Sequence, residues 1–419
     1  MYEFGLRVMK IISLIASAAC IFGSASLHAE GARVPRYPTA QFPAPRSSAT
    51  DFETMLFKGY YWSRYNAVVD YPMSKLGFSL KGPGMQTTTY LREVRRGEYA
   101  ETDREGRPVW FDGPAIVDLD NLVGFLLDDR KFADLDRLID DWTHRFKKNA
   151  DGRPTLRRFQ YALWTRLGGQ KEWEASAELI KLWKAANPRS VGLALMEAEY
   201  WSSLAADARG GDWASNVTKE QWALYRERAQ KGEKVLLESK SYAGDNPLWG
   251  MIYLQLTDGI GWSAQDRLKL FSEVAARHPD FIPYYFYLAE KLTPWWGGDW
   301  EIFDAFVRRV SKSGGTADGA GMYARIYWNT ASMHPRKLDI FRDTRVDWPL
   351  MKKGFEALSK AYPHSAHNAN AFAWFACAAG DGATYERVKH EIGASMIPIV
   401  WPTNLRPDDC DLKFRKKGI

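Results

Sequence analysis

The residues best suited to contact a ligand form a cluster of indoles beside a carboxylate. The segment Pro294–Trp300 reads Pro-Trp-Trp-Gly-Gly-Asp-Trp and places Trp295, Trp296, Asp299 and Trp300 on one turn. An indole offers an apolar face and an N–H donor, so it can stack on a sugar ring, a peptide or a Pro-rich segment. Adjacent Trp295 and Trp296 cannot both face the same core, so we expect at least one of them at a groove. The alternative is structural, because tryptophans at helix hairpins also wedge neighbouring repeats together.

A second glycine-rich turn carries an arginine, a carboxylate and an indole. The sequence Arg-Gly-Gly-Asp-Trp places Arg209, Asp212 and Trp213 together, and Glu197 lies on the helix expected before them. A buried Arg–Glu pair could hold a polar pocket here. The alternative is a structural salt bridge that fixes the end of a helix. Neither Gly-Gly turn matches a phosphate-binding loop, which needs more glycines and a following Lys-Ser or Lys-Thr.

Signals for catalysis or metal binding are weak in this sequence. His364 and His367 have a spacing that can chelate a metal, but no cysteine or carboxylate stands beside them. The chain has no Gly-x-Ser-x-Gly elbow and no His-Glu-x-x-His motif, and its Asp-Asp pairs resemble solvated turns or helix caps. We therefore assign no catalytic residue, no metal site and no cofactor, while the pattern does not exclude an enzyme.

Amphipathic helices that end on prolines must position these turns. A ten-residue phrase ending in proline recurs at Pro188, Pro279 and Pro363, and its positions eight and five before the proline are apolar each time. That spacing is one face of a helix. Proline then ends the helix, because it lacks an N–H and disfavours helical geometry in the preceding residue. The pattern is typical of an α-solenoid.

Glycine turns between amphipathic segments predict antiparallel helical hairpins. Three such turns occur, at Gly168-Gly169, Gly297-Gly298 and Gly380-Asp381, and a glycine can supply the left-handed cap that reverses the chain. The three prolines are 91 and 84 residues apart, which is no multiple of the tetratricopeptide period of about 34. The predicted fold is therefore all-α: an irregular helical-hairpin repeat, a tetratricopeptide-like α-solenoid, with a small irregular N-terminal segment.

The first residues resemble a secretory signal peptide. A basic start precedes an apolar stretch from Ile11 to Phe22, which is too short to span a bilayer, and small residues precede Ala29. Translation from Met9 would give a cleaner leader than translation from Met1. The predicted organisation is a signal peptide (1–29), a Pro-rich extended leader (30–50), an N-terminal helix with an irregular segment (51–115), a helical-repeat domain (116–393) and a C-terminal tail (394–419).

Composition and cysteines narrow the classes of partner. A net charge of +6 over 419 residues is small, and the basic run at Lys413–Lys417 is typical of a solvated tail. We expect no nucleic-acid partner and no transmembrane span in the mature chain. Cleavage after Ala29 leaves Cys377 and Cys410, which could form a disulfide in an oxidising compartment or remain separate thiols.

Three segments carry a resemblance to a known family. They are Ala205–Gly210, Leu292–Trp300 and Phe375–Asp381, and with the surrounding helices the likeness runs from about Phe132 to Ile392. On these residues the chain resembles a bacterial family of exported, tetratricopeptide-like helical proteins defined by a domain of unknown function. The resemblance implies a helical fold and export, and it implies no catalytic residue.

These patterns lead to one functional hypothesis and one rival. The leading hypothesis is an exported helical-repeat protein of the bacterial envelope, periplasmic or secreted, that binds a protein or peptide of unknown identity. The rival is an envelope enzyme or a glycan-binding protein with an aromatic-lined site around Trp295–Trp300 and Arg209–Trp213. Paired carboxylates facing one cleft would favour the enzyme, and an aromatic groove would favour binding.

Overall fold

The described part of the chain is helical almost throughout. The computed structural model describes residues 39–40, 52–61, 100–102, 108–109, 113–169, 171–212, 214–312, 316–333, 338–393, 400–402 and 404–415. The predicted signal peptide, most of the Pro-rich leader and Trp213 lie outside these residues. None of the described helices combines the length and apolar character that crossing a membrane requires.

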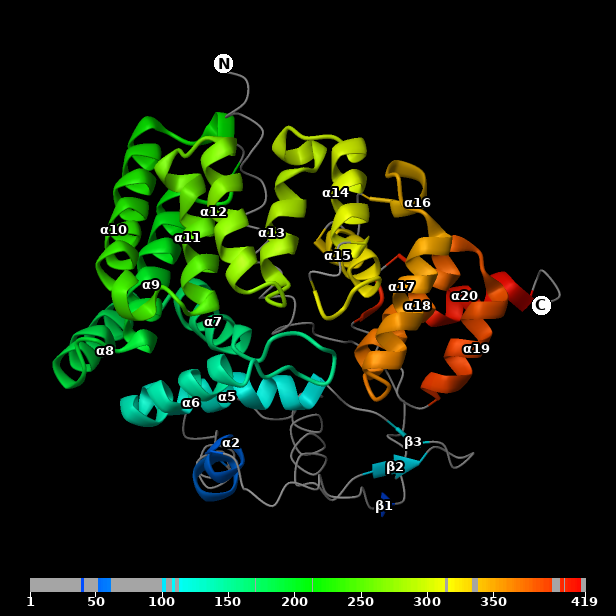
Figure 1. Cartoon of the computed structure of the whole chain (residues 1–419), viewed down its shortest axis with the longest axis horizontal. Helices are drawn as coiled ribbons and strands as arrows, with labels where there is room; N and C mark the ends of the chain where they lie inside the picture. Colours follow the sequence, from blue (N-terminus) through cyan, green and yellow to red (C-terminus); the bar gives the residue numbers. More distant parts are fainter. Residues whose placement is uncertain are drawn as a thin grey trace, which may run out of the picture.

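The elements follow one another as a long run of helices after a small sheet (Figure 1). Strands β1 (Thr39–Ala40), β2 (Ala100–Thr102) and β3 (Pro108–Val109) form an antiparallel sheet in the order β1-β2-β3. The α-helices are α2 (Phe52–Leu56), α5 (Gly113–Asp128), α6 (Phe132–His144), α7 (Arg157–Trp164), α8 (Trp173–Ala186), α9 (Val191–Arg209), α10 (Lys219–Ala243), α11 (Pro247–Ile260), α12 (Ala264–Arg277), α13 (Pro283–Lys291), α14 (Trp300–Lys312), α15 (Gly321–Met333), α16 (Ile340–Asp343), α17 (Trp348–Ala361), α18 (Ala366–Ala379), α19 (Gly382–Ile392) and α20 (Pro407–Arg415). Short turns of other helix types are η1 (Phe57–Tyr61), η4 (Thr165–Gly169), η5 (Ala214–Asn216) and η6 (Pro294–Trp296). This element order confirms the all-α class.

The prolines end their helices as the sequence predicts. Helices α8, α12 and α17 are capped by Asn187, His278 and Tyr362, the residues directly before the three prolines. Each cap leaves the helical region, with φ between −152° and −130° and ψ between 64° and 89°. A residue before proline is displaced from helical geometry in this way because the proline ring clashes with its backbone.

The glycine turns behave as predicted in two of three places. Gly297 and Gly380 cap η6 and α18 in the left-handed conformation, with φ of 88° and 80°. The expected cap at Gly168-Gly169 is wrong. There α7 widens into the π-type turn η4, which keeps Leu167 fully buried, and the left-handed conformation falls on Lys171 (φ 55°). Because Leu167 is buried, the helical turn continues through Gly168 and Gly169, and the chain reverses only after them.

The helices form two layers around one continuous core. Helix α10 buries a single stripe, Tyr225, Ala229, Gly232, Leu236, Ser239 and Ala243. Helix α11 is buried on nearly every face, from Pro247 to Gly259, and α15 is buried in the same way. An outer helix needs one apolar face, whereas an inner helix is covered on both sides. The apolar core runs without interruption from Phe52 to Phe414.

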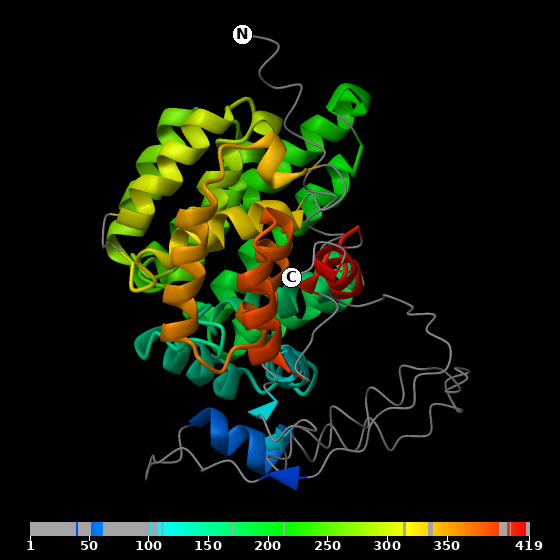
Figure 2. The same ribbon diagram turned by 90° about the vertical axis from the view of Figure 1, so that its right-hand side faces the viewer.

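The connection between α6 and α7 crosses to the far end of the array. Asp151 in this connection accepts a hydrogen bond through its carbonyl oxygen from Arg325 of α15 (2.5 Å) and another from Asn368 of α18 (3.2 Å). Arg325 also forms a fully buried ion pair with Asp318. Figures 1 and 2 show α5 to α7 lying across the ends of the later helices. The connection therefore joins segments more than 170 residues apart.

A glycine makes this crossing possible. Gly152 has φ of 86°, and a Cβ atom there would lie 2.3 Å from the ring of Tyr362 and 2.6 Å from the guanidinium of Arg325. Neither contact is sterically possible, and a positive φ is unfavourable for a side-chain-bearing residue. The backbone at Gly152 can approach α15 and α17 because no side chain intervenes.

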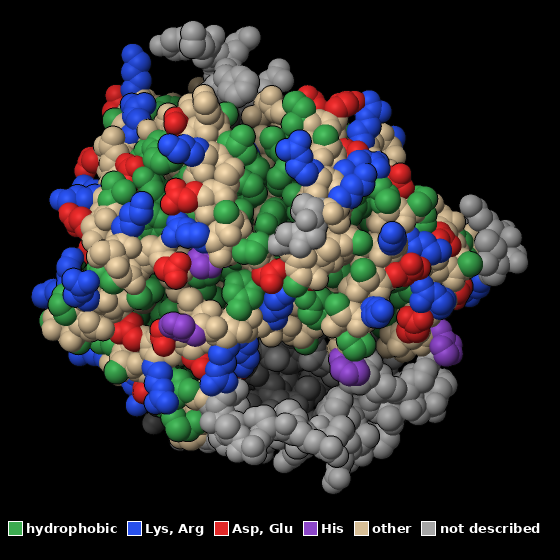
Figure 3. Space-filling view, viewed as in Figure 1, with side chains coloured by type: hydrophobic (Ala, Val, Ile, Leu, Met, Phe, Trp, Pro, Cys, Tyr) green, Lys and Arg blue, Asp and Glu red, His purple; other side chains and the backbone are tan. Residues whose placement is uncertain are grey.

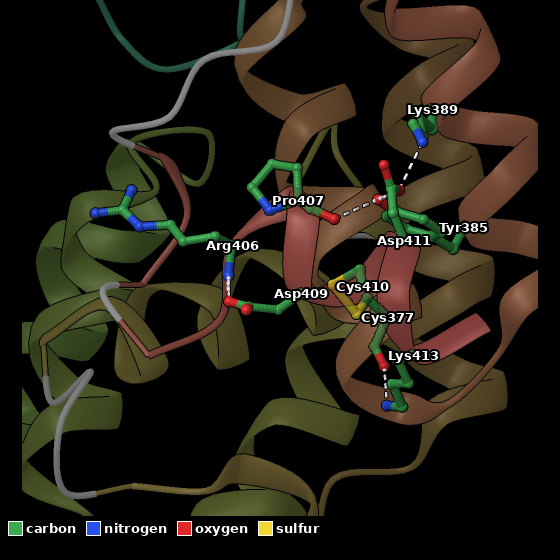
Figure 4. Close-up of a disulfide and its surroundings, with 9 residues drawn as sticks. All are labelled: Cys377, Tyr385, Lys389, Arg406, Pro407, Asp409, Cys410, Asp411 and Lys413. Carbon is green, nitrogen blue, oxygen red and sulfur yellow. Dashed lines mark hydrogen bonds and ion pairs between the residues drawn. A yellow bond between two sulfur atoms is a disulfide. The ribbon is translucent and has the colours of Figure 1, made fainter. Parts of the chain in front are cut away.

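Within the C-terminal segment, residues 407–415 form the helix α20, which packs against the array. Cys377 of α18 and Cys410 of α20 form a disulfide with a Cα–Cα distance of 5.9 Å, which confirms the bonded alternative (Figure 4). Phe414 of α20 is fully buried, and Lys413 donates a hydrogen bond to the carbonyl oxygen of Cys377 (2.7 Å). Cys410 and Phe414 are four residues apart, so one face of α20 carries both apolar groups against the array.

We expect the buried ion pair of Arg325 to be essential for stability. The substitution Arg325→Met would leave Asp318 charged and buried without its partner, and it would remove a donor from the Asp151 carbonyl oxygen. We expect the free energy of unfolding to fall by about 3 to 5 kcal/mol in urea denaturation. The matched control is Arg342→Met, which removes an ion pair with Asp343 at the protein surface and should leave stability nearly unchanged. Equal effects of the two substitutions would contradict this role for Arg325.

We expect the disulfide to stabilise the C-terminal end. The bond joins residues 33 apart, and the entropy model for a loop of this length predicts about 3 to 4 kcal/mol. Peptide mapping without reduction should recover Cys377 and Cys410 as one cross-linked species. The variant Cys410→Ser should be cleaved by protease within α20 much faster than the oxidised protein. Free thiols at both positions in protein from an oxidising compartment would contradict the assignment.

Candidate functional site

Antiparallel helices bring three connections to one edge of the molecule. Because α9 to α14 alternate in direction, the described residues of the turns 210–212 with 214–218, 261–263 and 292–299 all lie along the upper edge in Figure 1. We call these three turns the rim. Both glycine-rich turns singled out in the sequence belong to it. The hairpin repeat therefore places them on the same side of the protein, although they are more than 80 residues apart.

A buried charge network lies beneath the rim. Lys291 at the end of α13 forms an ion pair with Asp258 of α11 (2.6 Å), and Asp258 also binds Arg267 of α12 (3.3 Å). The ammonium group of Lys291 lies 2.9 Å from the ring centre of Trp296, close enough for a strong cation–π contact. The pKa of Lys291 is lowered because burial outweighs the attraction of Asp258 and Glu290. Trp296 is thus fixed from below by a paired lysine.

Glu290 is the least satisfied member of this network. Burial raises its pKa to about 7, although the charge of Lys291 opposes the rise. Within the described residues, its Oε1 atom and the indole Nε1 of Trp296 are both buried and form no hydrogen bond of good geometry. A carboxyl group with this pKa changes its charge near neutral pH.

The three tryptophans of the turn divide between core and surface. Trp296 is only 7% exposed, whereas Trp295 and Trp300 are partly exposed and their rings meet edge to face at 5.3 Å between centres. The neighbouring residues Trp295 and Trp296 therefore face different environments, one partly exposed and the other buried. Asp299 caps α14 by accepting a hydrogen bond from the Ile302 amide (2.7 Å), so its carboxylate has a structural role.

The second glycine residue of this turn is required by close packing. A Cβ atom at Gly298 would lie 2.0 Å from the carbonyl oxygen of Leu292, and the Gly298 amide donates to the carbonyl oxygen of Thr293 (3.0 Å). A side chain at this position would push the turn away from the end of α13. The geometry that presents Trp295 and Trp300 is therefore fixed by local backbone contacts.

The turn after α9 is organised differently from the expectation. Arg209 is fully buried, donates to the Gly210 carbonyl oxygen (2.7 Å) and lies 5.9 Å from the ring of Trp222. Burial lowers the pKa of Arg209, against the charges of Tyr225 and Asp212. The amide of Asn216 donates to Asp212 (3.2 Å) and thereby holds that carboxylate within the turn.

The pair expected between Arg209 and Glu197 is not formed. Glu197 binds Lys184 (3.4 Å), since it lies three helical turns before Arg209 on α9. Tyr225 of α10 is instead the side chain on which charges from both regions act. Burial and the nearby charge of Asp258 raise the pKa of Tyr225, and Arg209 opposes them. The charges of Asp258 and Arg209 thus act on the same phenol with opposite effects.

The two histidines lie in different environments. His364 is exposed, whereas the ring of His367 stacks near Trp328 at 4.8 Å between centres. Burial and the charge of Arg153 lower the pKa of His367 to about 3, so the imidazole is neutral at physiological pH. Among the described residues no group of three or more His, Cys, Asp or Glu side chains is placed to hold a metal ion.

A second cluster, which the sequence patterns did not indicate, lies on α7 and the connection before it. It consists of Arg153, Arg157, Arg158, Tyr161 and Trp164, and we call it the arginine cluster. The guanidinium of Arg157 lies 4.5 Å from the ring centre of Trp164 and 5.1 Å from that of Tyr161. The guanidinium of Arg158 also lies 4.5 Å from the ring centre of Tyr161. Arginine faces and aromatic faces thus alternate along one side of α7.

Positive charge dominates the electrostatics of the arginine cluster. Burial alone would raise the pKa of Tyr161, but the charges of Arg157, Arg158 and Arg153 outweigh it and lower this pKa. Beside the cluster, burial raises the pKa of Glu199 of α9, although hydrogen bonds from Gln160 and Trp164 oppose the rise. A phenol biased towards ionisation and a carboxyl biased towards neutrality are typical of functional sites.

The sequence did contain a signal for this cluster. Arg157, Tyr161 and Trp164 are spaced four and three residues apart, so a single helical face carries an arginine and two aromatic rings. This pattern did not indicate a site, because arginines on a helix usually lie on its solvent-exposed face. Here α9 and α11 cover that face, since Gln160 of α7 donates to both Glu199 (2.6 Å) and Gln255 (2.9 Å).

Comparison with known proteins gives a family likeness over part of the chain. Residues 120–236 match the family described as a domain of unknown function (DUF4034). The matched region contains the arginine cluster, Glu197, Arg209 and Asp212, whereas the Trp295–Trp300 turn lies beyond it. No curated protein and no solved structure matches the chain.

The pKa of Glu290 predicts a defined pH dependence of stability. Between about pH 4.5 and 7 the folded state keeps a proton on Glu290 that the unfolded state has lost, so stability should fall as the pH rises through this window. Glu290→Gln cannot lose a proton and should gain about 1 to 3 kcal/mol over the wild type by pH 8. Urea denaturation at pH 5, 6, 7 and 8 measures the difference. A difference that stays constant over this range would contradict the assignment.

Proposed function

We propose that the protein is an exported helical-repeat protein of the bacterial envelope that binds a protein or peptide segment along its rim. The observation that carries the proposal is the position of Trp295 and Trp300, two partly exposed indoles on a turn of fixed geometry at the edge of a helical array. Amphipathic aromatic side chains on a rigid support are the typical anchors of protein interfaces.

The surroundings of these indoles suit a polypeptide. Figure 3 shows hydrophobic side chains gathered between α12 and α14, over the position of α13, with charges of both signs around them. Phe286 and Leu288 of α13 are partly buried and pack against the apolar core. An apolar centre with a charged surround is the usual organisation of a protein interface.

The geometry favours a peptide over the rival glycan ligand. The rings of Trp295 and Trp300 are nearly perpendicular, at 87°. The edge of one ring therefore covers part of the face of the other, and the pair offers no flat platform on which successive sugar rings could stack. A peptide can place an apolar side chain against such a corner.

Alanine substitution at the rim tests this proposal. A peptide selected on the purified protein from a random displayed library serves as the probe, and calorimetry gives its affinity. We expect Trp295→Ala and Trp300→Ala to weaken binding at least tenfold, since truncated anchors commonly cost about 2 kcal/mol or more. Their melting temperatures should remain within a few degrees of the wild type.

Two further variants serve as controls. Trp296→Ala should lower stability by about 3 to 5 kcal/mol, because its indole is buried. Leu268→Ala removes an exposed apolar side chain of α12 and should leave binding unchanged. Retention of full affinity by both rim variants would contradict the proposed surface. Binding of oligosaccharides and of no peptide would instead favour the glycan-binding rival.

A further inference from the structure

The arginine cluster contains a positive charge that the described residues do not neutralise. Arg158 is paired with Asp120 of α5 through two hydrogen bonds, and Arg153 is paired with Asp151 (2.6 Å). Arg157 forms no ion pair with any described residue; its side chain hydrogen-bonds to that of Tyr161, and its Nη1 atom is buried without a hydrogen-bond partner. A charge removed from water is costly unless an opposite charge or several hydrogen bonds compensate it. The cost at Arg157 would be recovered by an anion from outside the chain.

The neighbouring carboxyl group does not meet this need. Glu199 is the acidic residue whose charge acts on Arg157, but its oxygens are already used within the protein. Gln160 donates to its Oε2 atom (2.6 Å), and the indole of Trp164 donates to its Oε1 atom (2.5 Å). Burial also raises the pKa of Glu199 and so favours its neutral form.

The position of Arg157 suits a planar anion. Its guanidinium is held by the rings of Trp164 and Tyr161, at 4.5 and 5.1 Å from their centres. Stacking uses the face of a guanidinium and leaves the in-plane N–H groups for hydrogen bonds, so the group stays oriented before a ligand arrives. Arg157, Tyr161 and Trp164 are each partly exposed, so a small ligand can reach them from solvent.

We propose that the arginine cluster binds a carboxylate, with Arg157 as its direct partner and the rings of Tyr161 and Trp164 against the carbon skeleton of the ligand. A carboxylate carries one negative charge and matches the one arginine that has no counter-ion. A phosphate dianion would instead bring one negative charge more than the site can compensate. This site is separate from the rim, and the proposal does not depend on peptide binding there.

Acetate and acetamide form a matched pair of probes, because they have almost the same shape and differ in charge. Acetate should raise the melting temperature of the protein beyond the effect of sodium chloride at equal ionic strength, and acetamide should not. Acetate should also shift the NMR signal of the Tyr161 ring, identified by its loss in Tyr161→Phe. Inorganic phosphate is the third probe and distinguishes a carboxylate site from a general oxyanion site.

Arg157→Gln is the decisive variant. We expect it to bind acetate at least tenfold more weakly, since a charge-assisted hydrogen bond is lost. Without acetate its melting temperature should equal or exceed that of the wild type, because an uncompensated buried charge has been removed. An arginine with a purely structural role would show the opposite, a clear loss of stability. Arg226→Gln makes the same charge change at an exposed position of α10 and should respond to acetate like the wild type.

Four results would overturn the proposal. They are an equal response to acetate and acetamide, an acetate response that Arg157→Gln retains, lower stability of this variant without acetate, and binding of phosphate but not of acetate. If Arg157→Gln does not fold, the acetate and acetamide titrations of the wild type still decide the matter through the Tyr161 ring signal. An unchanged ring signal during the acetate titration would then exclude the site.

Discussion

The side chain of Arg325 fixes the α6–α7 connection against α15, because it pairs with Asp318 in its own segment and also donates to the carbonyl oxygen of Asp151. Tyr362 donates a further hydrogen bond to Asp318 (2.6 Å), so this carboxylate is held by side chains from two segments of the chain. An apolar contact at this place could stabilise the fold as well, but it would tolerate sliding of the α6–α7 connection. The directional bonds instead fix the position of that connection, and Gly152 allows the close approach.

The same crossing determines which side chains meet in the interior. Arg153 follows Gly152 by one residue, and its guanidinium lies 5.7 Å from the ring of Trp328 on α15. Helix α7 begins four residues later, so Arg157 and Tyr161 enter the space beside α9 and α11. The arginine cluster therefore depends on the Arg325 contact, although Arg325 does not belong to it. A shift of the α6–α7 connection along the array would separate Arg153 from Tyr161 and weaken the positive charge around the phenol.

The features that could be predicted from the sequence are those determined by residues adjacent to one another in the sequence. The helix ends before Pro188, Pro279 and Pro363 follow from the steric effect of each proline, and the caps at Gly297 and Gly380 follow from backbone conformation. The Cys377–Cys410 bond stayed open because its formation depends on the docking of α20. The arginine cluster, the Glu197–Lys184 pair and the role of Tyr225 were missed for the same reason, since each depends on which distant helix covers a given face.

The contrast between the two clusters separates structural charge from charge held for a ligand. Beneath the rim, Asp258 pairs with both Lys291 and Arg267, and the charge of Glu290 also acts on Lys291, so removing any one of these groups would harm the fold. That network supports the turn above it through the contact of Lys291 with the ring of Trp296. In the arginine cluster Arg153 and Arg158 are compensated by aspartates and Arg157 is not. A protein rarely keeps a buried charge that weakens its own fold unless another function requires it. At the rim, buried charges stabilise the turn that carries Trp295 and Trp300. In the arginine cluster, the charge of Arg157 is itself the group that would contact a ligand.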